Sequence, residues 1–459
     1  MRLKMKIGTL FFLGMFIVCS AFARESFLDN VKRMKWKIGS EEVDVVWVED
    51  EKFPKFYASI YFQDGALSDS ISGLTQTTFD LLTSGTSKQS QRDISEFFDF
   101  YGVNLKHSVT HEYSVLSVEA LIRDMNPVMG KVCELFHDAQ FPQDELSSHL
   151  NRAQSRLKNM VTNHGNLADR VFRKISLEDT HYSEPVEGTL EGYKKINQVS
   201  LKSRLSDLNQ TRKVLYLSGP SEIKNLEGIL SKNCQWSNQK KATQMTVNKP
   251  GHQSSIYLVE VPGANQAQIR IGRYMTYNEF DSKYDHFYFM SRFLGGGFTS
   301  KLVQELRVKR GLTYSANAYV SMQRDYGRAG VTTFSKNETA SETISVIRDI
   351  ITDVTQENFD DIEFNHQKNH VIGAYAFGFE ETSAFLGQLM LYDHQNRDLE
   401  ELVFFPKNIQ KITKSEMSRM NMEAFPWDRL SIVVVGDKSL MKSLSRIRPV
   451  KLVRYRDYL

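Results

Sequence analysis

Arg307 and Tyr314 are the two side chains whose types and spacing offer the clearest chemistry in this sequence. Between them runs a segment that Thr299 or Ser300 can begin as a helix and that Gly311 can end. The guanidinium would lie near the helix end and the phenol just past the turn. Together they could donate hydrogen bonds to one oxygen or carboxylate. The alternative is a surface arginine beside a half-buried tyrosine, and the residue types alone favour it.

Three consecutive glycines, Gly295, Gly296 and Gly297, precede Phe298 and the predicted helix. A phosphate-binding loop would need a Lys-Ser or Lys-Thr ending, which is missing here. The sequence also lacks a Gly-x-Ser-x-Gly elbow and the combined set of Ser-x-x-Lys, Ser-Asp-Asn and Lys-Thr-Gly motifs, so it predicts no nucleophilic hydrolase. Neither a nucleotide site nor a serine nucleophile is indicated.

Two pairs of histidines have spacings that metal ligands use. His366 and His370 are four residues apart and could share one face of a helix, but Gln367 stands where a zinc peptidase would carry its glutamate. We interpret this pair as part of a solvated helix face. His107 and His111 lie in an alternating run that predicts one strand, with both side chains on one face. No third ligand is evident, so we interpret them as structural or surface residues.

Residues 1–23 predict a signal peptide. They combine a basic start, the apolar run 7–18 and a small-x-small pattern ending at Ala23. The apolar run is shorter than the ~18–20 residues of a membrane-spanning helix, and no other stretch qualifies. Val18 before Cys19 is too bulky for lipidation. We expect cleavage after Ala23 and export, with the periplasm favoured and secretion or envelope association as alternatives.

The charge balance changes once this segment is set apart. The 459-residue chain has 58 Lys and Arg against 55 Asp and Glu, and three of the basic residues lie in residues 1–23. The remaining chain is therefore neutral, which gives no reason to expect a nucleic-acid partner. Its two cysteines, Cys133 and Cys234, make neither a disulfide framework nor a zinc ribbon, although export would permit one disulfide.

Strand and helix signals alternate along the chain, which predicts an α+β protein. Strands are predicted over 43–48, 56–62, 256–261 and 268–272. Helices are predicted over 93–101 and 145–161.

The two halves of the sequence end alike. Asn197 and Thr413 can each cap a helix, and the strands at 214–217 and 430–435 follow them at the same offset. This repetition indicates duplication of one domain, with coincidence as the alternative. We predict two homologous α/β domains of about 210 residues each, 24–235 and 253–459, joined by the polar linker 236–252.

Residues 294–314 resemble the pitrilysin/insulinase-like metallopeptidases, a family that includes the mitochondrial processing peptidase. The matching segments are Gly-Gly-Gly-Phe-Thr-Ser-Lys-Leu at 295–302, Glu-Leu-Arg at 305–307 and Arg-Gly-Leu-Thr-Tyr at 310–314. The family has duplicated α/β domains in a clamshell arrangement. It also carries an arginine and a tyrosine seven residues apart that reach the substrate from opposite the zinc site. The resemblance thus implies the same role for Arg307 and Tyr314.

The first half departs from this family at its metal site. The family's inverted motif, His-x-x-Glu-His, would fall between Gly73 and Gly85, where Gln76 and Asp80 replace the histidines and Phe79 replaces the glutamate. Phenylalanine cannot activate a zinc-bound water, and glutamine is a poor ligand. The third ligand should come from a later helix, but residues 147–168 contain neither aspartate nor glutamate. We expect no metal in this chain.

The resemblance implies a metal-free subunit of an exported, heteromeric zinc peptidase. A homologous partner subunit would hold the zinc, while Arg307 and Tyr314 would act in trans on the peptide substrate and its oxyanion. Residues 295–298 would shape the chamber or contact the peptide. Two alternatives stay open: an inactive pseudo-peptidase that serves as a peptide-binding or assembly module, and a self-sufficient peptidase with a displaced metal site at His366 and His370.

Overall fold

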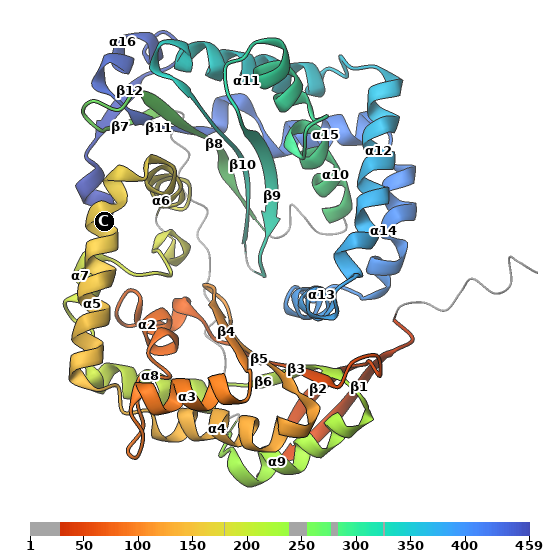
Figure 1. Ribbon diagram of the computed structural model, residues 1–459. Helices are drawn as coiled ribbons and strands as arrows, with labels where there is room; N and C mark the ends of the chain where they lie inside the picture. Colours follow the sequence, from red (N-terminus) through yellow and green to blue (C-terminus); the bar gives the residue numbers. More distant parts are fainter. Residues whose placement is uncertain (1–27, 179, 238–254, 277–282, 325) are drawn as a thin grey trace, which may run out of the picture.

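Two six-stranded sheets lie at opposite ends of the molecule (Figure 1). The computed structural model describes residues 28–178, 180–237, 255–276, 283–324 and 326–459. The predicted signal peptide and most of the predicted linker lie outside these residues. None of the helices within them is long and apolar enough to span a membrane.

The first sheet has the strand order β1-β2-β6-β3-β5-β4, and the second has the order β12-β7-β11-β8-β10-β9. The strands of the first sheet are β1 (Val31–Ile38), β2 (Glu41–Glu49), β3 (Lys55–Phe62), β4 (Asn104–Val109), β5 (Ser114–Leu121) and β6 (Lys213–Gly219). Those of the second are β7 (Ile256–Glu260), β8 (Gln266–Thr276), β9 (Ala316–Met322), β10 (Tyr326–Lys336), β11 (Ser431–Gly436) and β12 (Val450–Val453). Five strands correspond in order and direction. The edge strand differs, since β1 pairs antiparallel with β2 whereas β12 pairs parallel with β7. The predicted duplicated α+β fold is confirmed.

Helices cover both sheets. The first half contains α2 (Leu74–Asp80), α3 (Gln91–Phe100), α4 (Met125–Asp138), α5 (Gln143–Lys158), α6 (His164–Ser176), α7 (Leu190–Tyr193), α8 (Gln198–Gln210) and α9 (Leu226–Asn233). The second half contains α10 (Tyr284–Gly295), a π-helix (Val303–Lys309), α11 (Ala340–Thr355), α12 (Asp361–Tyr375), α13 (Thr382–His394), α14 (Glu400–Lys411), α15 (Lys414–Ala424) and α16 (Met441–Leu444).

The predicted repeat of a capped helix before the last central strand is confirmed. Asn197 caps α8 and Thr413 caps α15, each through a reciprocal capping box with the third helical residue. Strands β6 and β11 then occupy the same place in their sheets.

The two halves exchange helices, which the sequence did not lead us to expect. Helix α6 packs Leu167, Val171 and Phe172 on the second sheet, against residues of β7 and β11. Helix α13 packs Phe385 and Leu389 on the first sheet. The spacing of these apolar residues gives each helix one buried face. Because each half covers a face of the other, the halves are interlocked (Figure 1).

A buried hydrogen-bonded network ties α13 to the first half. Glu112 Oε2 lies 2.7 Å from His394 Nε2, and Glu112 Oε1 accepts a 2.8 Å bond from the Tyr182 hydroxyl. The other ring nitrogen of His394 lies 2.9 Å from the Tyr61 hydroxyl. Burial alone would raise the pKa of Glu112, but the hydrogen bond and charge of His394, with smaller contributions from the Arg324 amide and the Tyr182 hydroxyl, outweigh it, so the pKa lies below the ordinary value.

Replacing Glu112 with glutamine should lower the free energy of unfolding by about 2 kcal/mol, because hydrogen bonds to a buried charged group are lost. Urea unfolding followed by circular dichroism measures this loss. A group with a depressed pKa stabilises the fold above its unfolded pKa and loses that effect as the pH falls through its folded value. The difference between wild type and Glu112→Gln should therefore shrink in acid. A constant difference between neutral and strongly acidic pH would contradict this account of the pair. Exposed Glu342 on α11 offers a control as Glu342→Gln.

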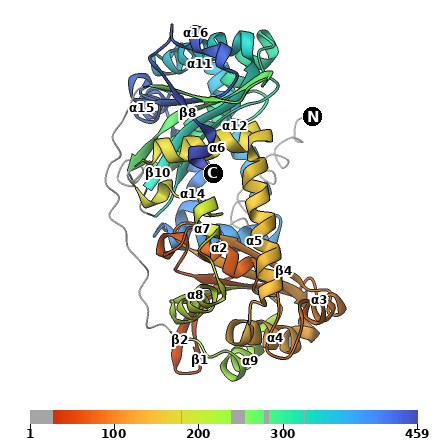
Figure 2. The same ribbon diagram turned by 90° about the vertical axis from the view of Figure 1, so that its left-hand side faces the viewer.

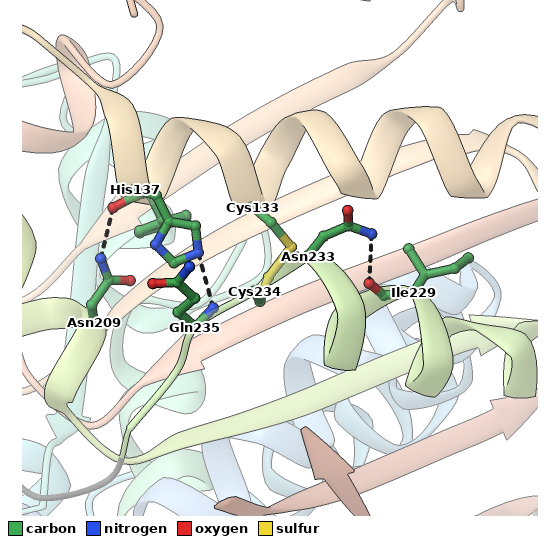
Figure 3. Close-up of a disulfide and its surroundings, with 8 residues drawn as sticks. Cys133, His137, Asn209, Ile229, Asn233, Cys234 and Gln235 are labelled. Atoms are coloured by element: carbon green, nitrogen blue, oxygen red, sulfur yellow. Dashed lines mark hydrogen bonds between the residues drawn. A yellow bond between two sulfur atoms is a disulfide. The ribbon is translucent and has the colours of Figure 1, made fainter. Parts of the chain in front are cut away.

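Cys133 of α4 and Cys234, which follows α9, form a disulfide (Figure 3). Both cysteines are buried in the first core. Beside the bridge, the backbone amide of Gln235 donates to His137 Nε2 over 2.9 Å (Figure 3). The bridge thus fixes the chain to α4 at the end of the first half.

The expectation of one strand through both His107 and His111 was wrong. His107 lies in β4, but residues 110–113 form the turn to β5, and His111 is in that turn. His111 is buried and its Nε2 lies 2.8 Å from the Glu184 carbonyl oxygen. The alternation continued through the turn by chance, so the two rings serve different neighbours.

Candidate functional site

Helix α2 carries the three positions where the sequence departs from the zinc motif. Gly73 begins it in a left-handed conformation (φ +87°), and a Cβ there would meet the backbone at Gly188. The buried Arg204 guanidinium holds the segment before the helix, donating to Asp64 Oδ2 over 2.7 Å and to Thr75 Oγ1 over 2.7 Å. Glycine and arginine together fix the position of this short helix.

The side chains that replace the zinc ligands bind one another and two histidines. Gln76 Nε2 donates to Asp80 Oδ1 over 2.8 Å, and His107 Nε2 lies 2.9 Å from the same oxygen. His149 Nε2 of α5 lies 3.5 Å from Asp80 Oδ2. Both carboxylate oxygens of Asp80 are thereby engaged by nitrogen atoms.

Phe79 takes the position of the missing glutamate and points into the core. It is 4% exposed, packs against Phe62 and Phe136, and stacks on His107 with ring centroids 5.8 Å apart. It therefore supports the fold and offers no proton acceptor.

The titration of this cluster follows from its contacts. Burial alone would raise the pKa of Asp80, but hydrogen bonds from His107 and Gln76 outweigh it and bring the pKa below its ordinary value. Burial lowers the pKa of His149, and the Asp80 carboxylate offsets only part of this effect. The polar groups of the cluster thus bind one another, with the Asp80 carboxylate at its centre.

These residues do not fit a zinc ion. A catalytic zinc site needs three side-chain ligands and an open position, with a base beside it. Here Phe79 supplies no base, and the oxygens of Asp80 already face nitrogen donors. Within the described ranges, no group of three His, Cys, Asp or Glu side chains is arranged to hold a metal ion.

Arg307 lies in the π-helix Val303–Lys309, in the segment that the sequence singled out. The predicted start and end of this helix are close to those observed. Gly311 follows the helix in a left-handed conformation (φ +62°). The guanidinium carbon of Arg307 is 5.6 Å from the centre of the exposed Phe298 ring. Within the described chain, Arg307 forms no ion pair with a carboxylate, so its donors are available.

Tyr314 is presented to solvent on a loop that is fixed on both sides. Thr313 Oγ1 donates to the Ser315 carbonyl over 2.9 Å, and Thr333 Oγ1 of β10 donates to the same carbonyl over 2.8 Å. The Tyr314 side chain is 79% exposed. Among the described residues its hydroxyl has no hydrogen-bond partner. The backbone beside Tyr314 is thus fixed while its hydroxyl is free. This combination suits a side chain that binds a second molecule.

The glycine segment before the π-helix divides into two parts. Gly295 is buried at the end of α10, where a Cβ would lie 2.1 Å from the backbone nitrogen of Ala318 in β9. Gly296 is buried too, and a Cβ there would lie 2.5 Å from the Cα of Arg292, whereas Gly297 and Phe298 are exposed. Gly295 and Gly296 thus permit close packing, and Gly297 and Phe298 form the accessible surface beside Arg307.

His366 and His370 lie on α12 and are both exposed. The interpretation of a solvated helix face agrees with this placement. Among described residues they belong to no metal-binding group, so a displaced metal site gains no support.

A large cavity with a volume of about 1510 Å³ lies between the two halves. Helices α5 and α6 form one wall, and Figure 2 shows α5 spanning the space between the two sheets. Gln76 and Asp80 line the cavity, as do Tyr319 of β9 and Arg328 of β10. Arg307 and Tyr314 are not among the described residues that line it. The structure therefore does not bring the Arg/Tyr pair together with the remnant of the zinc motif.

Sequence reasoning missed several of these groups. His149 and Arg204 lie on helices far from the motif, and only the folded chain places them beside α2. One sequence feature indicated the basic character of α5. Residues 147–168 contain no carboxylate and carry Arg152 and Arg156 at helical spacing.

Comparison with known families finds two matches that together cover most of the chain. Residues 44–190 match the family model described as insulinase (peptidase family M16). Residues 208–371 match the one described as peptidase M16 inactive domain.

Similar proteins carry both active and inactive descriptions. An uncharacterized zinc protease, YmxG of Bacillus subtilis, is 24% identical over 72% of this chain and 81% of its own length. A protein of Helicobacter pylori described as a non-peptidase homolog is 20% identical over 88% of this chain and 94% of its own.

A solved structure of a peptidase M16 inactive domain from Pseudomonas fluorescens has the same fold. It superposes with a TM-score of 0.79 at 20% identity, covering 89% of this chain and 98% of that one. A protease structure from Helicobacter pylori gives a TM-score of 0.76 at 15% identity, covering 88% and 99%.

Proposed function

The chain belongs to the M16 (insulinase) peptidase family as a homologue without the family's zinc motif, and from this premise we propose that it is the metal-free subunit of a two-chain peptidase. One contrast carries the proposal. In helix α2, an Asp–His cluster whose members bind one another stands where the family carries its zinc ligands. The Arg307 guanidinium and the Tyr314 hydroxyl, by contrast, are present as free hydrogen-bond donors.

The proposed chemistry divides between the two chains. A zinc-bearing homologous partner would supply the metal that activates water. This chain would supply Arg307 and Tyr314, which would together anchor the peptide backbone and donate hydrogen bonds to the oxyanion. Donors aimed at a developing negative charge stabilise the transition state more than the substrate. The exposure of both side chains supports action in trans, because they need a second chain to meet.

We further propose that the protein is exported, with the periplasm as the favoured compartment. The disulfide between Cys133 and Cys234 supports this location, since such bonds persist in oxidising compartments.

A second candidate function is an inactive module that binds peptide or assembles with other chains. The description of the similar Helicobacter pylori protein as a non-peptidase homolog favours it. This candidate predicts peptide binding with no turnover in the presence of any partner.

Affinity purification of the tagged chain from its native cells, followed by metal analysis, tests the proposal. We expect a homologous subunit containing His-x-x-Glu-His to copurify, with about one zinc per pair of chains. The chain purified alone should hold no stoichiometric zinc and cleave no peptide. Stoichiometric zinc or cleavage in the single chain would contradict the proposal.

A further inference from the structure

Five arginines line the large cavity between the two halves. They come from α5, α6 and β10, and they are Arg152, Arg156, Arg170, Arg173 and Arg328. Four asparagines, which can bond peptide groups as donors or acceptors, line it as well: Asn151, Asn159, Asn163 and Asn166. The cavity therefore combines strong positive charge with neutral hydrogen-bonding groups.

The cavity holds fewer carboxylates than arginines, and Glu187 is the one that acts on Arg170 and Arg173. Three acidic residues line it: Asp80, Asp169 and Glu187. Asp80 is engaged by two histidines, and Asp169 is paired with Arg270. Among the described residues, none of the five arginines lies within ion-pair distance of a carboxylate. Positive charge in the cavity thus exceeds the negative charge available to balance it.

Two of these arginines lie near enough to each other for their charges to interact. The Arg173 and Arg328 charges repel, and burial together with this repulsion lowers the pKa of Arg173. The Nε of Arg328 is buried and has no hydrogen-bond partner within the described chain. A buried, unpaired donor is costly unless something binds it. This pair therefore favours an anion between or beside its guanidinium groups.

Arg170 is fixed by neutral partners. It donates to the Tyr458 and Gly188 carbonyl oxygens, the latter over 2.8 Å, and the Glu187 charge offsets only part of the lowering of its pKa by burial. Arg152 and Arg156 are exposed on α5, one turn apart. Opposite α5, the ring of Tyr319 fills the space above Gly330, where any side chain would clash with it. The helical side of the cavity is thus basic, and the sheet side adds the Arg328 guanidinium and the Tyr319 ring.

We infer that this cavity selects peptide segments rich in aspartate and glutamate. This inference rests on the proposed function, because it names the class of peptide that the chamber accepts. At about 1510 Å³ the cavity exceeds the ~300–1,000 Å³ typical of small-molecule pockets. Arginine forks bind carboxylates in bidentate geometry, and the asparagines can bond the backbone between acidic residues.

Fluorescence anisotropy with the full chain, in the absence of a partner, tests the inference. The probes are two labelled peptides of equal length, one rich in Asp and Glu and the other carrying Lys and Arg at the same positions. The acidic peptide should bind at least about tenfold more tightly, and its affinity should fall with added salt. Equal binding of the two peptides, or no binding of the acidic one, would overturn the inference.

Variants assign the binding to this cavity. Arg173→Gln combined with Arg328→Gln should weaken binding of the acidic peptide about tenfold or more. Arg152→Gln combined with Arg156→Gln alters exposed side chains only, so it should keep the fold and also weaken binding. Arg348→Gln, on α11 and paired with Asp349, is the matched control and should leave the affinity unchanged. Unchanged affinity in both double variants would overturn the inference.

Two further readouts separate the possible ligands and proposals. Displacement of the peptide by millimolar inorganic phosphate would assign the arginines to phosphate and overturn the peptide assignment. The measurement needs no second subunit, so its failure leaves the two-chain proposal standing. In Arg307→Ala, loss of cleavage by the two-chain enzyme would support the proposed function. Intact binding of the acidic peptide by the same variant would support the assignment of that binding to the cavity.

Discussion

Replacing Arg307 with alanine is expected to lower peptide cleavage by the assembled two-chain enzyme about 100-fold. Removing one donor from a preorganised oxyanion site costs about 10²–10³ in rate. Arg307 has no carboxylate partner among the described residues and packs on the exposed Phe298 ring, so its loss should not disturb the core. The measurement is the turnover of a quenched fluorescent peptide at saturating partner. Tyr314→Phe, which removes only a hydroxyl from an exposed side chain, should lower the rate in the same direction.

Arg310→Ala is the matched control for Arg307→Ala. It is also an exposed arginine, three residues further on, and lies 3.7 Å from Glu305. We expect it to change the rate by less than about twofold, as is usual for exposed ion pairs. An unchanged rate in Arg307→Ala, or an equal loss in Arg310→Ala, would refute the role assigned to Arg307.

Breaking the Cys133–Cys234 disulfide should lower the free energy of unfolding by about 4 kcal/mol. The bridge joins positions 101 residues apart, and closing so long a loop restricts the unfolded chain strongly in the chain-entropy model. Three of the four tryptophans report on the same part of the molecule, since Trp36, Trp47 and Trp236 are buried in the first core. Urea unfolding followed by their fluorescence, with and without reductant, measures the effect.

A double variant, Cys133→Ser with Cys234→Ser, provides the control for the disulfide experiment. It should unfold at a lower urea concentration than the oxidised protein and should not respond to reductant. A wild-type midpoint that is the same with and without reductant would contradict the assigned bridge.

Much of the fold could be predicted from local sequence signals. Alternating β-branched runs predicted β2, β3 and β7, and the caps at Asn197 and Thr413 predicted α8 and α15. These signals work because hydrophobic periodicity and capping act within a few residues. The exchange of α6 and α13 between the halves could not be predicted. An apolar helix face indicates that it is covered, but not which sheet covers it.

The candidate site was predicted in part. The positions of Gln76, Phe79 and Asp80 were identified, because they stand where the family carries its motif. Their contacts with His107 and His149 depend on how β4 and α5 fold over α2 and leave no trace in residue spacing. The basic cavity was missed for the same reason, since Arg173 and Arg328 meet only across the two halves.

The rate of peptide cleavage by the purified zinc-bearing partner, titrated with this chain, tests the central claim most directly. The partner alone should be nearly inactive, and the rate should rise with added chain and level off at one chain per partner. The chain with Arg307→Ala should bind the partner equally well but restore about 1% of that rate. A partner that is fully active alone, or a rate that does not rise with added chain, would contradict the account.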